Sequence, residues 1–123
     1  MSITWIPRDP GGYLLTLPGV QSVSYSKRIK RFGWAYEDGT IVLRPMSKAG
    51  TLVVGIHEAT HVAGYLDHDV SFFLAEVEAF RRAGIPCWYP PLLPSFLAVP
   101  FGLLLEGYLY LAATVLYGVN RCR

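Results

Sequence analysis

The chain has 123 residues, of which 52% are hydrophobic and 16% are charged. This length suits one domain spanning residues 1–123, and the net charge of +2 is too small for a nucleic-acid binder, so no nucleic-acid partner is expected. The opening residues, MSITWIPRDPGG, contain no basic segment followed by an apolar run. They predict no secretory signal, and we expect a cytoplasmic protein.

The first third of the chain is expected to hold loops and a small sheet. Residues 1–22 are predicted to be loop-rich, with at most one short strand, because 7–19 reads PRDPGGYLLTLPG. Residues 23–45 are predicted to form an antiparallel β-meander, in which Asp38-Gly39 marks a hairpin turn. Four basic residues in this stretch are expected on a solvent-exposed strand face, namely Lys27, Arg28, Lys30 and Arg31.

A helix is predicted to begin after the N-cap Ser47 and to run to about Leu66. Its inner face is expected to carry an apolar stripe formed by Leu52, Ile56, Ala59, Ala63 and Leu66. The same segment contains His57-Glu58-Ala59-Thr60-His61, which has H-E-x-x-H spacing. Two histidines four residues apart share a helix face and can bind one Zn²⁺ ion, so zinc is the expected cofactor. Glu58, beside the first ligand, is the predicted general base.

A second helix is predicted from Asp69 or Ser71 to Ala83, which completes a pair of active-site helices over residues 47–84. Glu76 falls on the apolar side of this helix, with Phe72, Phe73, Ala79, Phe80 and Ala83. A bare carboxylate is costly to bury, and a metal ion would compensate it. Glu78 lies on the opposite face, where exposed ion pairs with arginines explain it. We therefore predict that Glu76 is the third metal ligand.

Other third ligands remain open. From His57 to Asp67 the spacing is H-E-x-x-H-x-x-G-x-x-D, which resembles the metzincin arrangement and would make Asp67 the ligand. Against this alternative, Gly64 is expected to continue in helical register, and Glu76 would be left unexplained. His68 and Glu106 are the remaining candidates.

Residues 34–83 resemble the gluzincin metallopeptidases at His57, Glu58, His61, Glu76 and Ala79. The segment Glu76-Val77-Glu78-Ala79-Phe80 looks like the E-x-E-A-D or E-x-E-A-N segment of HtpX-like and ImmA/IrrE-like peptidases. In those families the first Glu binds the metal, which implies the same role for Glu76. Phe80 stands where those families have Asp or Asn, so a polar contact to a ligand is missing or is supplied elsewhere.

The end of the chain, residues 92–119, is expected to form an apolar helical tail. A helix over 101–119 is long enough to cross a bilayer, but Glu106 argues against a lipid-facing span. Glu106 would instead be a partner for a zinc-bound histidine. We favour a packed core helix or an oligomer contact over a membrane span. Cys87 and Cys122 are expected to be free thiols.

The expected fold class is therefore α+β and zincin-like, with a small antiparallel sheet, an H-E-x-x-H helix, a Glu-bearing helix and a C-terminal apolar helix. The expected function is zinc-dependent hydrolysis of a protein or peptide substrate, which would pair with an exposed strand edge. The oxyanion donor is left open among Tyr65, His68 and Tyr108. The alternatives are a non-catalytic zinc protein and a membrane-associated interaction protein.

Overall fold

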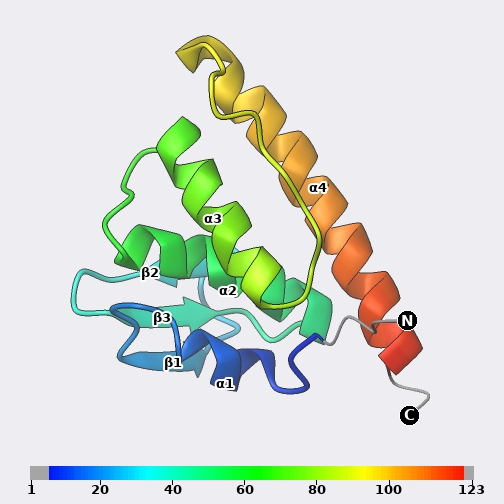
Figure 1. Ribbon diagram of the computed structural model, residues 1–123. Helices are drawn as coiled ribbons and strands as arrows, with labels where there is room; N and C mark the ends of the chain where they lie inside the picture. The colour runs from blue at the N-terminus through cyan, green and yellow to red at the C-terminus, as the bar shows by residue number, and fades with distance from the viewer. Residues whose placement is uncertain (1–5, 121–123) are drawn as a thin grey trace.

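The structure, a computed structural model, describes residues 6–120 and has an α+β fold, as predicted. Figure 1 shows the strands at the base, α2 above them, and α3 and α4 on the side of α2 away from the sheet. The elements are α1 (Pro10–Leu14), β1 (Ser22–Tyr25), β2 (Gly33–Ala35), β3 (Thr40–Leu43), α2 (Lys48–Val62), α3 (Val70–Arg82) and α4 (Ser95–Asn120).

The sheet is mixed, so the prediction of an antiparallel β-meander over 23–45 is wrong. The strand order is β1-β3-β2, with β3 antiparallel to β2 and parallel to β1. The predicted hairpin at Asp38-Gly39 does join β2 to β3, and Gly39 has a φ of 92°. The N–H of Gln21 donates to the Gly39 carbonyl at 2.8 Å, which docks the start of β1 on the other side of β3.

Because β3 lies between β1 and β2 in the sheet, the connection from β1 to β2 crosses over β3. The four basic residues Lys27, Arg28, Lys30 and Arg31 lie in that connection, between Tyr25 and Gly33, and not on a strand. The prediction of a basic strand face is therefore wrong. All four side chains belong to exposed residues of a loop.

The predicted loop-rich segment 1–22 contains a short helix, α1, where we had expected a strand at most. Pro10 occupies its first position, where a missing N–H costs nothing because that N–H has no helical partner. Leu14 is fully buried at its end. A Cβ atom on Gly55 of α2 would overlap the Leu14 side chain, so glycine is what lets α1 pack closely on α2.

Helix α2 is capped by Ser47, as predicted, because the Ser47 side chain accepts a hydrogen bond from the Gly50 N–H at 3.1 Å. It ends at Val62, four residues earlier than predicted. Leu52, Ile56 and Ala59 are buried, whereas Ala63 is exposed and Leu66 is 78% exposed. The inner stripe therefore stops at Ala59, because the chain leaves the helix before Leu66.

Helix α3 agrees closely with its prediction. Asp69 caps it by accepting a hydrogen bond from the Phe72 N–H at 2.9 Å, and Gly84 follows its end with a φ of 95°. Glu76 is 0% exposed, as its place in the apolar stripe predicts. Glu78 lies on the exposed side, 3.4 Å from the Arg82 guanidinium.

Helix α4 begins at Ser95, before the predicted start at 101, and is buried on one side only. The buried side packs on the domain through Ala98, Gly102, Leu105, Leu109 and Ala113. The other side exposes large apolar residues, including Phe96, Leu103, Leu104, Leu111 and Val115. The described part of the helix is long and apolar enough to cross a membrane, and 28% of its most apolar window is buried. This arrangement is compatible with either a cytoplasmic or a membrane-associated protein.

Candidate metal centre

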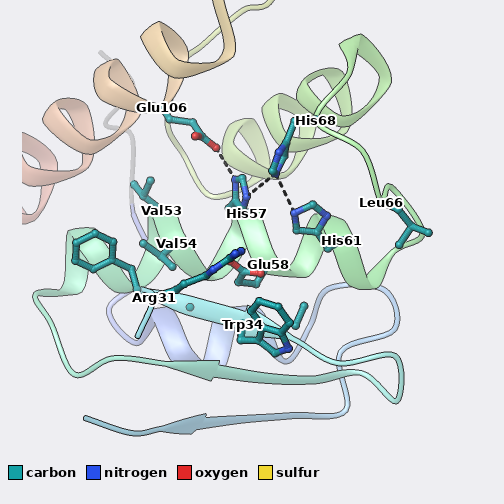
Figure 2. A pocket seen from close by; sticks show the side chains of 13 residues that line it. Arg31, Trp34, Val53, Val54, His57, Glu58, His61, Leu66, His68 and Glu106 are labelled. Atoms are coloured by element: carbon teal, nitrogen blue, oxygen red, sulfur yellow. Dashed lines mark hydrogen bonds and ion pairs between the residues drawn. The ribbon is translucent and has the colours of Figure 1, made fainter. Parts of the chain in front are cut away.

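Three histidine side chains converge beside α2 (Figure 2). The Nε2 atom of His68 lies 3.1 Å from Nε2 of His57 and 3.1 Å from Nε2 of His61. His57 and His61 face the same way because they are four residues apart on one helix. Zn–N bonds of about 2.0–2.1 Å in tetrahedral geometry separate the ligand nitrogens by roughly 3.3 Å. The three nitrogens are therefore spaced to hold one metal ion.

The hydrogen bonds of the other ring nitrogens decide where the protons lie. His61 donates from Nδ1 to the Tyr65 carbonyl at 2.8 Å, and His57 donates from Nδ1 to Glu106 Oε2 at 2.6 Å. Both rings in their neutral form then direct an Nε2 lone pair towards His68. A proton between two of these rings can bridge only one pair of Nε2 atoms, whereas a metal cation that displaces it could be bound by all three. Such outer hydrogen bonds are typical of histidines that bind metals.

Gly64 brings His68 to the other two histidines. The N–H of Gly64 donates to the His61 carbonyl at 3.0 Å, and the N–H of Tyr65 donates to the Thr60 carbonyl at 3.3 Å. These two bonds and a φ of 111° at Gly64 form a Schellman motif, which ends α2. The expectation that Gly64 continues the helix is therefore wrong. The chain turns back after Gly64, and the same turn places the Tyr65 carbonyl on His61.

Two carboxyl groups lie behind His57. Its Nδ1 atom is 3.2 Å from Glu76 Oε2 on α3, in addition to its contact with Glu106 on α4. The interaction of Glu106 with a histidine of α2 is thus confirmed. Glu76 Oε1 is buried and has no hydrogen-bond partner among residues 6–120. The buried Glu76 carboxyl has His57 as its partner, and its role as a metal ligand stays a prediction.

Within residues 6–120, two groups of ligand atoms have all members within 4.8 Å of one another. One group is His57, His61 and His68, and the other is His57, Glu76 and Glu106. Asp67, the ligand of the metzincin-like alternative, is exposed and belongs to neither group. The two groups share His57, whose Nε2 faces the histidines and whose Nδ1 faces the carboxyls.

Burial and hydrogen bonding shift the pKa values of these groups in different directions. Burial lowers the pKa of His57, but the hydrogen bonds to Glu106 and Glu76 outweigh it and raise the pKa to about 10. Burial lowers the pKa of His61 and of His68, which favours their neutral, metal-binding forms at pH 7.

The two carboxyls behind His57 also differ. Burial raises the pKa of Glu76 to about 8, although the hydrogen bond from His57 acts in the opposite direction. Burial of Glu106 acts to raise its pKa, but the hydrogen bond from His57 outweighs this and lowers the pKa. The negative charge of the pair is therefore carried preferentially by Glu106, which is the less buried of the two carboxyls.

The three histidines lie in a cleft of about 560 Å³ between β2 and α2. Glu58 also lines this cleft, and burial raises the pKa of its carboxyl despite the nearby charges of His57 and Arg31. A Cβ atom on Gly33 would lie 2.7 Å from Val54 Cγ1 and 3.1 Å from Glu58 Cγ. Glycine at the start of β2 therefore lets the strand approach the H-E-x-x-H helix closely.

The β2 strand is at the edge of the sheet, since it pairs only with β3 in the described part of the chain. Its residues line the same cleft, which places a strand edge beside the three histidines. One of the residues proposed as an oxyanion donor lies elsewhere, because Tyr108 lines a different pocket and donates its hydroxyl to the Pro86 carbonyl at 2.6 Å.

The sequence patterns favoured Glu76 over His68, although His68 was among the candidates. Helical spacing identifies ligands on one helix, but His68 lies in the loop between α2 and α3. The signal that could have identified His68 is Gly64, because glycine is the residue type that most often ends a helix in a left-handed conformation. A glycine three residues after the second histidine of the motif therefore indicates that the chain turns back there.

Comparison with known proteins adds no relative, because no family model, curated protein or solved structure matches the chain.

Proposed function

We propose that the chain is a zinc-dependent metallopeptidase in which His57, His61 and His68 bind the metal and Glu58 is the general base. The observation that carries this proposal is the convergence of three Nε2 atoms in a cleft that Glu58 also lines. Three protein ligands are typical of catalytic zinc sites, which keep a further position open. The resemblance of residues 34–83 to gluzincin peptidases supports the same reaction. It differs in the third ligand, because it implies Glu76 in place of His68.

Zinc, when bound, would supply a Lewis acid that polarises the scissile carbonyl and lowers the pKa of water. Glu58 would accept a proton from the attacking water on its carboxylate and pass it to the leaving amine. A raised pKa suits both steps, because the group must accept and then release the proton near neutral pH. Glu106 would act on His57 by holding its Nδ1–H, which keeps Nε2 directed at the metal.

A protein or peptide is the substrate class that the cleft fits best. Edge strands present unpaired backbone groups, and an extended peptide can pair with them. The edge of β2 borders the cleft from Gly33 to Ala35. A peptide paired with this edge would pass across the three histidines, which brings its backbone carbonyls to the place where hydrolysis would occur.

The test combines metal content with hydrolysis of an unfolded protein such as casein. We expect about one zinc per chain. Glu58→Gln should keep the metal and lose hydrolysis, because it keeps the shape of the side chain and removes the base. Glu78→Gln is the matched control, since Glu78 is exposed and its ion pair within residues 6–120 is with Arg82. A zinc-loaded wild type that cleaves no protein or peptide would contradict a catalytic role and favour a zinc that only stabilises the fold.

A further inference from the structure

The loop between β1 and β2 carries a cluster of positive charge, and one of its basic residues lines the cleft beside the histidines. Four of its residues are basic, and all four are exposed, namely Lys27, Arg28, Lys30 and Arg31. The ion pairs found in residues 6–120 involve His57 and Arg82 as the cations and none of these four. No ion pair in the described part of the chain fixes these four side chains, although the charge of Arg31 also acts on the nearby Glu58 carboxyl.

Arg31 is the member of this group that lines the metal cleft (Figure 2). The guanidinium carbon of Arg31 lies 5.1 Å from the ring centroid of Trp34. The indole ring therefore supports the cation through its face, and the N–H groups of the guanidinium stay free to bind a ligand. Trp34 is on the edge strand β2 and lines the same cleft. The geometry thus presents a guanidinium, supported by an aromatic ring, at the strand edge where a peptide would pair.

A peptide that pairs antiparallel with β2 would meet Arg31 with its C-terminal part. β2 runs from Gly33 to Ala35, with Arg31 just before its start. An antiparallel partner runs in the opposite direction, from the Ala35 end towards the Gly33 end. The C-terminal part of such a peptide therefore lies nearest to the loop that carries Arg31. The opposite end of the cleft is lined by Leu66, which is apolar and 78% exposed.

We propose that Arg31, supported by Trp34, forms a carboxylate-binding subsite for the part of a peptide that follows the scissile bond. This inference rests on the proposed peptidase function. A guanidinium presents a planar fork of N–H donors that matches a carboxylate, and peptides carry this group on Asp and Glu side chains and at the C-terminus. An acidic side chain and a C-terminal carboxylate would both bind Arg31 in this way, and the experiment below distinguishes them. Arg31 is in this role a specificity-determining residue.

The test measures binding of labelled peptides to zinc-loaded Glu58→Gln protein by fluorescence anisotropy, so that no peptide is consumed. Three peptides of one length are compared. The first carries Glu in its C-terminal half and an amidated end, the second has Gln in place of that Glu, and the third is the Gln peptide with a free C-terminal carboxylate. We expect at least one carboxylate peptide to bind about tenfold more tightly than the amidated Gln peptide. The tighter peptide identifies the source.

The preference should disappear when Arg31→Gln is added and persist when Arg28→Gln is added. Arg28 is the matched control because it belongs to the same loop, is exposed and does not line the cleft. Equal binding of all three peptides, or a preference that survives Arg31→Gln, overturns the proposal. An equal loss of affinity for all three in Arg31→Gln also overturns it, since it would show a general role in the cleft.

The failure of this subsite can be told apart from failure of the peptidase proposal. Arg31-dependent binding together with a wild type that cleaves no peptide would leave the subsite standing and contradict the proposed reaction. Cleavage by the wild type without any Arg31-dependent preference would support the peptidase function and contradict the carboxylate-binding subsite.

Discussion

The Nδ1 atom of His57 lies 2.6 Å from Oε2 of Glu106, which ties the H-E-x-x-H helix to α4 across 49 residues of sequence. Glu106 is the only Asp, Glu, Lys, Arg or His in the described part of α4, and its carboxyl turns towards His57 and the cleft. The contact gives the apolar helix a part in the candidate metal centre. It also explains why a carboxylate is present in an otherwise apolar segment.

Glu106→Ala should weaken zinc binding about tenfold to a hundredfold, because the hydrogen-bonded partners of metal-binding histidines typically contribute this much. Competition with a zinc chelator measures the affinity. Glu78→Gln removes an exposed carboxylate of α3 and should leave the affinity unchanged. An affinity equal to that of the wild type in Glu106→Ala would show that its contact with His57 does not orient the ligand.

The third metal ligand can be assigned by the same titration. We expect His68→Ala to lose more zinc affinity than Glu106→Ala does, because it removes a direct ligand. Glu76→Gln should lose less zinc affinity than His68→Ala, because the Glu76 carboxyl contacts Nδ1 of His57 and would act on the metal only through that histidine. Asp67→Asn is the neighbouring control and should bind zinc normally. The reverse order for His68→Ala and Glu76→Gln would restore the gluzincin ligand set of His57, His61 and Glu76.

Gly33→Ala should destabilise the fold by about 1–3 kcal/mol, as overpacking of close contacts usually does. A Cβ atom there would lie 2.7 Å from Val54 Cγ1 and 2.9 Å from Leu43 Cδ2. Hydrolysis should also fall, because the added methyl group pushes β2 away from Glu58. Gly107→Ala is the control, since no heavy atom lies within 4 Å of its Cβ position and alanine favours a helix. Unfolding in urea compares the two, and equal stabilities would contradict the close packing of β2 on α2.

The two sides of α4 should respond differently to truncation. Leu109 is 0% exposed and Leu111 is 67% exposed. Leu109→Ala should cost about 2–5 kcal/mol of unfolding free energy, whereas Leu111→Ala should stay within about 0.5 kcal/mol of the wild type. Urea titration without detergent measures both. Similar small effects would mean that α4 does not pack on the domain in solution, as expected of a helix that spans a membrane.

Cys87 should react slowly with thiol reagents. It is a free cysteine, and burial raises the pKa of its thiol to about 11 although Arg81 acts to lower it. Only about one molecule in a thousand carries the thiolate at pH 8, and the alkylation rate should rise about tenfold per pH unit up to pH 11. Cys122→Ser isolates this reaction, because Cys122 lies outside the described residues. A rate that levels off near pH 8.5 would contradict the burial of the thiol.

Local interactions along the chain were sufficient to predict several elements and part of the site. Ser47 and Asp69 cap the helices as their residue types predict. His57 and His61 share a face because of helical spacing, and Glu76 is buried because it falls in an apolar stripe. Each of these features depends on residues within a few positions of one another, where hydrogen bonding and side-chain periodicity act directly.

Only the tertiary structure decided the pairing of the strands and the surroundings of the histidines. β1 lies parallel to β3, with a hydrogen bond from the Gln21 N–H to the Gly39 carbonyl at its start, and residue periodicity does not reveal this pairing. His68 reaches His57 because the left-handed conformation of Gly64 prevails over the continuing helical pattern. Glu106 comes from the last helix, and its place beside His57 depends on how α4 packs on α2. Contacts between distant segments depend on how whole elements pack, so a local pattern cannot determine them.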